Sequence, residues 1–383
     1  MREVSIIGVG QTPVGEHWQR SLRELGVEAV RAALADAGLE RPQALFVGNM
    51  MSGVLNHQEN LATLIADFAG FPGIEALKIE AACASGGAVV RAAQLAVASG
   101  ACDIAVAVGL EKMTDLPIDI VTEGLATAAD ADFEAAHGIT FTALNALLMR
   151  LYMERYGYQR ADFAPFIVHA HENAIGNPNA MFHNRVTVEE FLESAMVADP
   201  ISILDSSPVS DGAAAVVVCP SEQARAFTDR PIRILASATA TDTIGLATRR
   251  DPLRFEACYA SVHRAYQQAN LRPEDIDLAE LHDAFTIVSA LSLEAACFAE
   301  PGQGVRFAQE CNISLNGKLP MSTQGGLKAR GHPVGASGTY QIVEAVNQLR
   351  GRGGANQVKN CEIALTQSVG GMASVAVTHI LGV

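Results

Sequence analysis

The amino-acid sequence predicts an α/β protein made of two similar halves, with a mostly helical segment inserted into the first half. Strand-like and helix-like runs alternate over most of the 383 residues, a pattern typical of sheets covered by helices. The order of these runs recurs in the last part of the chain, which indicates an internal duplication.

In the first half of the chain, short apolar runs predict strands, and longer runs with a period of about 3.6 residues predict helices. The run before Gly38 is amphipathic and ends at that glycine, a frequent helix terminator. The run over 88–98 is apolar nearly all round, so we expect a helix buried between layers. The expected strands are 4–9, 44–47, 77–81 and 103–109, and the expected helices are 21–37 and 88–98.

The second half repeats this order. Ala269-Asn-Leu-Arg-Pro echoes Ala37-Gly-Leu-Glu-Arg-Pro, and Ala336-Ser-Gly opens a helix as Ala84-Ser-Gly does. The run over 362–370 mirrors the strand over 103–109. The remaining expected strands are 232–236 and 276–281, and the expected helices are 253–269, 285–298 and 336–346.

Between the halves, residues 116–198 break the alternation with helices over 141–152 and near 161–174. Such an insertion commonly forms a lid or a wall of a binding site. The expected division is a first half over 1–115 and 199–228, an inserted loop domain over 116–198, and a second half over 229–383.

Composition excludes several classes of function. Apolar residues make up 49% of the chain and the net charge is −15, so a large core is expected and binding to nucleic acid or an anionic membrane is not. The seven cysteines show neither C-x-x-C pairs nor zinc spacing, which favours a reducing compartment and no metal. Without a signal peptide, a membrane-spanning run or a peroxisomal tail, a cytoplasmic protein is expected.

Cys83 lies where a strand turns into a helix. Ser85 is a candidate N-cap, Gly86 and Gly87 would let a bound acyl group approach the backbone, and the helix N-terminus would stabilise a thiolate. The alternative is that Cys83 is a small buried hydrophobic residue.

Two histidines favour the catalytic interpretation. His282 follows a short strand and precedes an apolar helix, and His332 lies in a Gly/Pro-rich loop just ahead of a helix. A cysteine and two histidines at such turns form a plausible set of nucleophile and bases.

The motifs around these residues resemble those of the thiolases. Cys83 lies in Ala-Cys-Ala-Ser-Gly-Gly, His282 in His-Asp-Ala-Phe, and His332 in Gly-His-Pro-Val-Gly-Ala-Ser-Gly. The sterol-carrier-protein-2-type and archaeal-type thiolases are the most similar branch. The resemblance covers essentially the whole chain and implies a five-layered α-β-α-β-α duplication with a loop domain. Further matching segments are 109–113, 137–140, 177–182 and 207–215.

The resemblance implies acyl transfer from a coenzyme A thioester, with no cofactor. Cys83 would carry the acyl group, and His332 would take its proton. His282 and His332 would form one oxyanion hole, and the backbone N–H groups of Cys83 and Gly370 a second. Acetoacetyl-CoA thiolase chemistry, Claisen condensation or its reversal by thiolysis, is the expected reaction. The matching substrate-binding positions are Met113, His137, Ser207 and Phe285.

One residue departs from the thiolase pattern. Where thiolases carry a second cysteine as acid/base, gap-free alignment places Ser368, and the alternative position after His-Asp is Ala284. A serine hydroxyl is a poor proton carrier near neutral pH. Either a histidine transfers the carbon-2 proton, or the enzyme is a decarboxylating or non-thiolytic acyltransferase of the ketoacyl-synthase type. Cys311 or Cys361 could also replace the missing thiol, the other cysteines being structural, and a non-catalytic lipid-carrier or scaffold subunit is the remaining alternative.

Thiolases also imply partners for this chain. A homodimer or homotetramer is expected, and archaeal-type relatives associate with a small OB-fold protein.

Overall fold

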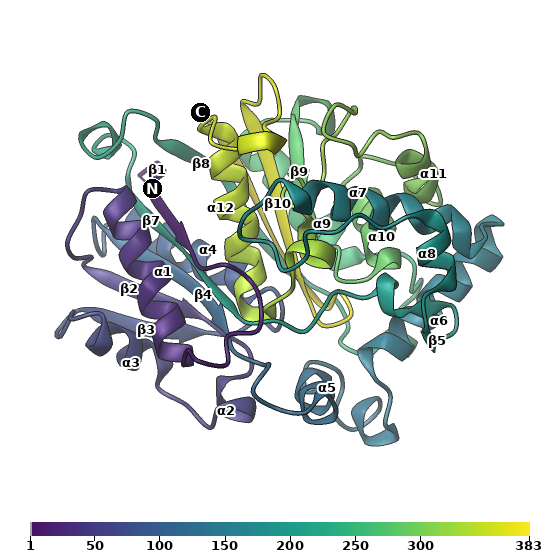
Figure 1. The fold of residues 1–383 in the computed structure, drawn as a ribbon. Coiled ribbons are helices and arrows are strands. Elements are labelled where there is room, and N and C mark those ends of the chain that lie inside the picture. The colour runs from purple at the N-terminus through teal and green to yellow at the C-terminus, as the bar shows by residue number, and fades with distance from the viewer. Residues whose placement is uncertain (1) are drawn as a thin grey trace.

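The computed structural model describes residues 2–383, in which nine strands run in the order β3-β2-β4-β7-β1-β8-β11-β10-β9 (Figure 1). Two sheets, one from each half, join only at Ser5 opposite Arg233 and Ile6 opposite Ile232. The strands are β1 (Val4–Gln11), β2 (Ala44–Gly48), β3 (Glu75–Ile79), β4 (Ala105–Glu111), β7 (Gly212–Pro220), β8 (Ile232–Thr241), β9 (Leu278–Glu280), β10 (Ile363–Gly370) and β11 (Val375–Gly382).

The two halves have the same topology. The order β1-β7-β4-β2 in the first half corresponds to β8-β11-β10-β9 in the second, and in each half only the last of these pairings is parallel. Both helices that follow the first strand end in a left-handed residue, Gly38 at φ +66° and Asn270 at φ +53°. The predicted duplication is confirmed.

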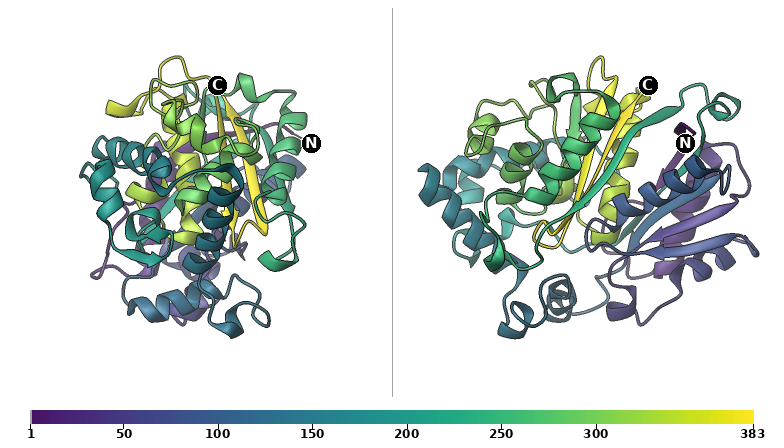
Figure 2. Two further views of the ribbon diagram at one scale, coloured as in Figure 1. Left: turned by 90° about the vertical axis from the view of Figure 1, so that its right-hand side faces the viewer. Right: turned by 180° about the vertical axis from the view of Figure 1, so that it is seen from behind.

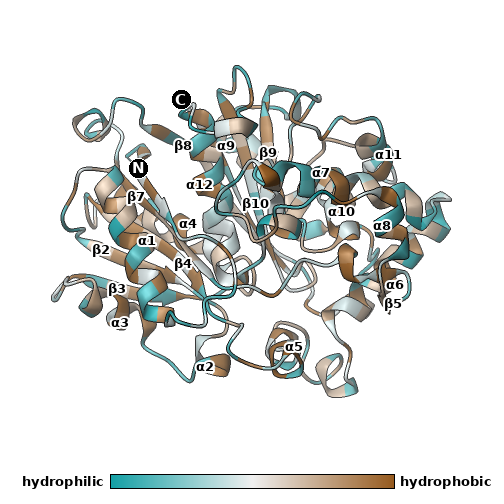
Figure 3. Ribbon diagram, viewed as in Figure 1, coloured by the Kyte–Doolittle hydropathy of each residue, from teal (hydrophilic) through white to brown (hydrophobic). Residues whose placement is uncertain are grey.

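Helices complete the five layers that the thiolase resemblance implied. The middle layer packs between the two sheets, and the outer helices cover their far faces (Figures 1 and 2). The middle layer contains α4 (Ser85–Ser99) and α12 (Ser337–Leu349); the outer layers contain α1 (Leu22–Asp36), α3 (Leu61–Phe68), α9 (Glu256–Ala269) and α10 (Thr286–Ala295). In Figure 3 the strands of the first sheet are mostly hydrophobic, whereas α1 is hydrophobic on one side only.

Burial differs between the two middle helices. All residues of α12 except Asn347 are buried, but α4 leaves Leu95 38% exposed. The prediction that α4 lies buried between layers is confirmed, although Leu95 and Ser99 near its C-terminal end reach the surface. α12 is buried more completely.

The segment between β4 and β7 is mostly helical and packs partly on the second half. Tyr152 and Phe163 share a core with Ile287 and Leu291 of α10, and the Tyr152 hydroxyl donates to Glu294 Oε1 at 2.6 Å. No helix within residues 2–383 is long and apolar enough to span a membrane. The segment contains α5 (Ile118–Ala126), α6 (Phe141–Tyr156), α7 (Ala164–Ile175), α8 (Val188–Glu193), β5 (Met196–Ala198) and β6 (Ile201–Ser202); α2 (Ser52–Leu55) and α11 (Gly304–Gln309) lie outside it.

Candidate active site

Cys83 lies on a tight turn between β3 and α4, as predicted. Ala82, just before it, has φ +49°, a conformation that non-glycine residues seldom adopt. The Ser85 hydroxyl accepts from the Ala81 N–H at 2.8 Å and donates to the Ala82 carbonyl at 2.6 Å. Ser85 is thus the first residue of α4 and not its N-cap; its side chain holds the strained turn that presents Cys83.

Gly86 and Gly87 serve helix packing, which corrects their predicted role beside an acyl group. A Cβ on Gly86 would lie 2.6 Å from the Thr339 nitrogen of α12, and one on Gly87 would collide with the Ser368 hydroxyl. The two glycines allow α4 to approach α12 and β10 closely.

His332 is held in one tautomer. Its Nδ1 lies 2.7 Å from Ser337 Oγ, and that hydroxyl donates to the Pro333 carbonyl at 3.3 Å. Because the serine proton is already engaged, Nδ1 donates and Nε2 keeps a free lone pair. Nε2 is therefore able to accept a proton.

His282 meets His332 edge to face, with ring centroids 5.2 Å apart. The neighbouring Asp283 fixes this segment, since its carboxylate accepts from the Leu327 N–H at 2.7 Å and the Ser322 hydroxyl at 3.2 Å. His282 Nδ1 is buried and has no hydrogen-bond partner in the described chain.

Both imidazoles are neutral near pH 7. Burial lowers the pKa of His282 to about 3, helped by the charge of Arg330. Burial, His282 and Arg330 together hold the pKa of His332 well below 6.5.

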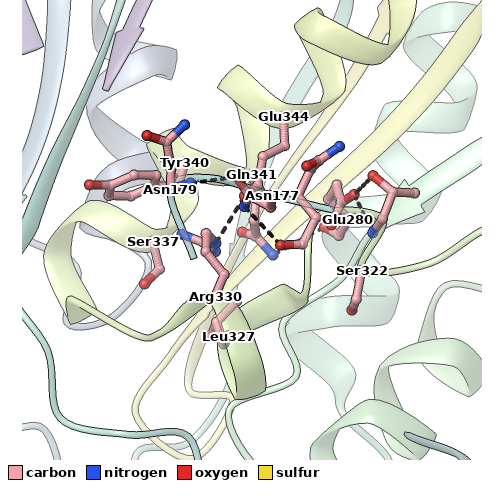
Figure 4. A network of polar contacts seen from close by, with 12 residues as sticks. Asn177, Asn179, Glu280, Ser322, Leu327, Arg330, Ser337, Tyr340, Gln341 and Glu344 are labelled. Atoms are coloured by element: carbon pink, nitrogen blue, oxygen red, sulfur yellow. Dashed lines mark hydrogen bonds and ion pairs between the residues drawn. The ribbon is translucent and has the colours of Figure 1, made fainter. Parts of the chain in front are cut away.

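Arg330 belongs to a buried network behind the histidines. Its Nε lies 3.0 Å from Glu344 Oε1, and its guanidinium lies 4.8 Å from the Tyr340 ring centroid. Figure 4 shows Arg330 pointing toward Glu344, with Glu280 nearby on its own strand. Because its charge is matched by Glu344, Arg330 is part of the framework.

The Cys83 thiol is protonated at rest, contrary to the expectation of a stabilised thiolate. Burial, followed by the charges of Glu111 and Glu80, raises its pKa to about 12. The backbone N–H groups of Cys83 and Gly371 act in the opposite direction. Gly371 lies in the cavity wall with Cys83, whereas the predicted Gly370, one residue earlier, lies in β10 against the Ala81 carbonyl and outside the wall.

Glu111 joins the two halves beside Cys83. Its Oε2 accepts from the N–H groups of Met50 and Gly335, both at 3.0 Å, and its Oε1 accepts from Asn49 at 2.6 Å and Met51 at 3.1 Å. Gly335 follows His332 in the same loop, so this buried carboxylate connects the Cys83 half to the His332 loop.

Cys83, His282 and His332 all line one cavity of about 500 Å³. Four other predicted positions lie in its wall: Met113, Ser207, Ala284 and Phe285. The inserted segment also contributes to the wall, as expected for a loop domain, with Ile118, Thr122, Leu125, Thr140, Phe141, Thr142, Asn145, His171, Phe182 and Val197.

Two predicted positions lie elsewhere. The His137 side chain is exposed on a surface turn outside the wall. Ser368 packs between Gly87 and Gly338, because alternation along β10 turns Val369 toward the cavity and Ser368 toward the helices. Neither position supports the role expected from sequence.

The other cysteines do not approach the cavity. Cys311 is exposed, Cys361 is half-buried, and within residues 2–383 Cys83 is the only cysteine in the wall. Nor does the described chain gather three His, Cys, Asp or Glu side chains that could hold a metal ion.

From the sequence, Lys328 is a candidate for a coenzyme A phosphate, but an isolated basic residue beside a loop is more often solvated, so the predicted site does not include it. The structure buries it in the cavity wall, where Nζ donates to the Asp205 carbonyl at 2.7 Å. The left-handed Gly325, Gly326 and Gly331 around it were the available signal of a tightly folded loop.

The duplicated five-layer fold and a cavity lined by a cysteine and two histidines are typical of α/β enzymes that transfer acyl groups. Comparison with known protein families identifies the family. Residues 4–222 match the thiolase N-terminal domain, and residues 238–383 match the thiolase C-terminal domain-like family. The chain belongs to the thiolase family.

Similar proteins span nearly the whole chain. Acetyl-CoA acetyltransferase of Methanothermobacter thermautotrophicus is 47% identical, covering 99% of both chains, and that of Methanocaldococcus jannaschii is 40% identical, covering 100% of this chain and 99% of the relative. Among solved structures, the Ltp2-ChsH2(DUF35) aldolase has a TM-score of 0.86 at 26% identity, covering 99% of this chain and 97% of that one.

Proposed function

We propose that this thiolase moves acyl groups from coenzyme A thioesters through an acyl-enzyme on Cys83, as an acetyl-CoA acetyltransferase. The observation that carries the proposal is the convergence of Cys83, His282 and His332 on one apolar cavity. The archaeal relatives named acetyl-CoA acetyltransferase support a short acyl group.

In the first half-reaction, sulfur attack and proton transfer occur together, because the thiol is protonated at rest. Nε2 of His332 accepts the Cys83 proton while the sulfur attacks the thioester carbonyl. The N–H groups of Cys83 and Gly371 stabilise the oxyanion; one such donor typically lowers the barrier by about 3 kcal/mol. Coenzyme A leaves with the proton returned by His332.

In the second half-reaction, a nucleophile removes the acyl group from Cys83. For condensation this is the carbon-2 carbanion of a second thioester, whose oxyanion His282 and His332 would hold. Since the wall contains no second thiol among the described residues, we assign the carbon-2 proton to the histidine pair. Thiolysis uses the same groups in reverse.

The lack of a second thiol among the described wall residues also favours an alternative reaction of the ketoacyl-synthase type, in which loss of carbon dioxide generates the carbanion. Two reactions of the same enzyme preparation distinguish the alternatives. Conversion of acetoacetyl-CoA and CoA to acetyl-CoA supports the thiolase reaction. Decarboxylation of malonyl-CoA by the acylated enzyme, without thiolysis, would replace it with the ketoacyl-synthase type.

We also propose assembly with other chains. β3 is an edge strand, its Leu77 side chain is 52% exposed, and an open edge of this kind pairs readily with a second strand. A second copy is the proposed occupant. The solved relative that contains ChsH2(DUF35) supports a separate partner protein as well. Light scattering of the purified chain, alone and with such a partner, tests both.

A further inference from the structure

Lys328 is a buried cation in the catalytic cavity that the proposed reaction does not use. It lies in a single π-helical turn over Gly326–Arg330, a feature common at functional sites. The residue is 2% exposed yet forms part of the cavity wall. The loop that contains Phe182 holds this turn in place, because the backbone N–H of Phe182 donates to the Ala329 carbonyl at 3.1 Å.

The ammonium has no ion-pair partner. Within residues 2–383 its one hydrogen bond goes to the neutral Asp205 carbonyl, and no carboxylate oxygen lies within 4.0 Å. Of the nearby carboxylates, Asp283 accepts from Leu327 and Ser322, and Oδ2 of Asp205 accepts from the N–H and hydroxyl of Ser202. Oδ1 of Asp205 is buried without a hydrogen-bond partner in the described chain, and it too lies more than 4.0 Å from the ammonium. Two of the three ammonium donors are left for a ligand.

The cavity wall offers nothing else to balance this charge. Among the described residues in the wall, Lys328 is the only lysine or arginine, and there is no aspartate or glutamate. His171 is neutral near pH 7 because burial and the charge of Lys328 lower its pKa, although the hydrogen bond that Nδ1 donates to the Asn184 carbonyl, at 3.1 Å, acts in the opposite direction. Burial likewise lowers the pKa of Lys328 to about 8, although Asp283 and Asp205 oppose this. A lone ammonium in an apolar cavity favours the entry of one negative charge.

Lys328 is anchored on the Asp205 side of the cavity. Its Nζ donates to the Asp205 carbonyl, and His171 of α7 lies in the same wall. Arg330, by contrast, pairs with Glu344 behind the histidines. A group bound by Lys328 is therefore held beside the Asp205 segment.

We propose that Lys328 binds a carboxylate at the far end of the acyl chain, so that this enzyme accepts coenzyme A thioesters of dicarboxylic acids. The acyl group would form a thioester with Cys83 at one end and a charge-assisted hydrogen bond with Lys328 at the other. The inference rests on the proposed acyl-enzyme and adds the substrate class.

The test compares thioesters that differ only in the terminal group. Glutaryl-CoA is paired with valeryl-CoA and adipyl-CoA with hexanoyl-CoA, and the rate of Cys83 acylation is followed by intact-protein mass spectrometry. The wild-type enzyme is expected to react faster with at least one carboxylate than with its methyl counterpart. If both methyl compounds react faster, the inference is wrong.

Lys328→Met is expected to lower the carboxylate-to-methyl rate ratio about 10- to 100-fold, the size of a lost hydrogen bond to a charged group. Lys328→Arg keeps the cation and should retain part of the preference. Lys318→Met, at an exposed lysine, is the matched control and should leave the ratio unchanged. An equal loss for all four thioesters would show that Lys328 binds the coenzyme A moiety, which overturns the inference.

The wild-type comparison decides the matter even if Lys328→Met does not fold. Failure of every thioester to acylate Cys83 would refute the proposed function itself. Acylation by valeryl-CoA and hexanoyl-CoA without a preference for their carboxylate partners would refute only the role of Lys328.

Discussion

His282 and His332 meet with ring centroids 5.2 Å apart and planes at 82°. Two charged imidazoles at this distance would repel each other, and burial already disfavours one charge. In the proposed reaction the pair therefore starts as two neutral rings, and His332 takes a proton only when Cys83 releases it.

The histidine pair makes folding stability depend on pH. The pKa of His282 is about 3 in the folded protein and 6.5 as the ordinary value, so between these values the unfolded chain binds a proton that the folded chain does not. The contribution of His282 to stability is thus present above pH 6.5 and is lost as the pH falls. Between pH 7.5 and 5.5 the expected loss is about 1.4 kcal/mol.

Urea unfolding of wild type and His282→Asn at both pH values measures this loss. The difference in unfolding free energy between the two proteins should shrink by about that amount at pH 5.5. The exposed His263→Asn should behave like wild type. A difference that does not change with pH would mean that His282 is not held neutral.

A thiol placed in the cavity should supply a second acid/base group beside Cys83. Ala284 lies in the wall, so Ala284→Cys should raise the rate of acetoacetyl-CoA thiolysis at pH 7 to 8 if the carbon-2 proton transfer is limiting. Ser368→Cys is the contrasting variant, since that side chain packs against Gly87 and Gly338. It should lose about 1–3 kcal/mol of stability through overpacking and gain no activity. A faster Ser368→Cys enzyme would contradict the placement of Ser368.

Glu111→Gln should lower the pKa of the Cys83 thiol and also lower the free energy of unfolding. Removing the charge of Glu111 lowers the pKa of the Cys83 thiol. A carboxamide has one acceptor oxygen in place of two, so either Met50 and Gly335 or Asn49 and Met51 lose their acceptor and the unfolding free energy falls by about 1–3 kcal/mol. The pH profile of Cys83 alkylation and thermal unfolding measure the two effects. Glu16→Gln at the surface should change neither, and an alkylation midpoint that rises in Glu111→Gln would refute the assigned influence.

Gly86→Ala should separate the two middle helices. The added methyl group would lie 2.6 Å from the Thr339 nitrogen and 2.9 Å from the Gly338 nitrogen, which are backbone atoms that cannot turn aside. We expect a loss of stability of at least about 1–3 kcal/mol. Gly15→Ala has no atom within 4 Å of the new carbon and serves as the control. Equal melting temperatures for the two variants would argue against this close packing.

Local patterns predicted most of the architecture. The echo of Ala37-Gly-Leu in Ala269-Asn-Leu marks the same left-handed helix end in both halves, because such an end depends only on nearby residues. Cys83, His282 and His332 were found because each lies in a short motif. The alternation of β10 could also have revealed that Val369, and not Ser368, faces the cavity.

Features that depend on distant contacts could not be predicted. Gly86 meets Thr339, 253 positions further along the chain, so its purpose is invisible locally. Lys328 lies in the cavity wall because it packs beside the Asp205 segment and α7, which are far from it in the sequence. The high pKa of the Cys83 thiol comes first from its burial in the folded chain and next from Glu111, which reaches the site from β4.

The most direct test of the central claim is intact-protein mass spectrometry after incubation with acetyl-CoA. Wild-type protein should gain one acetyl group, and peptide analysis should place it on Cys83. Cys83→Ala should gain none. His332→Ala should be acetylated about 10²- to 10⁴-fold more slowly, because the base that takes the thiol proton is missing. No adduct on the wild type with any acyl-CoA, or the same adduct on Cys83→Ala, would contradict the assignment of Cys83 as the acyl-carrying nucleophile.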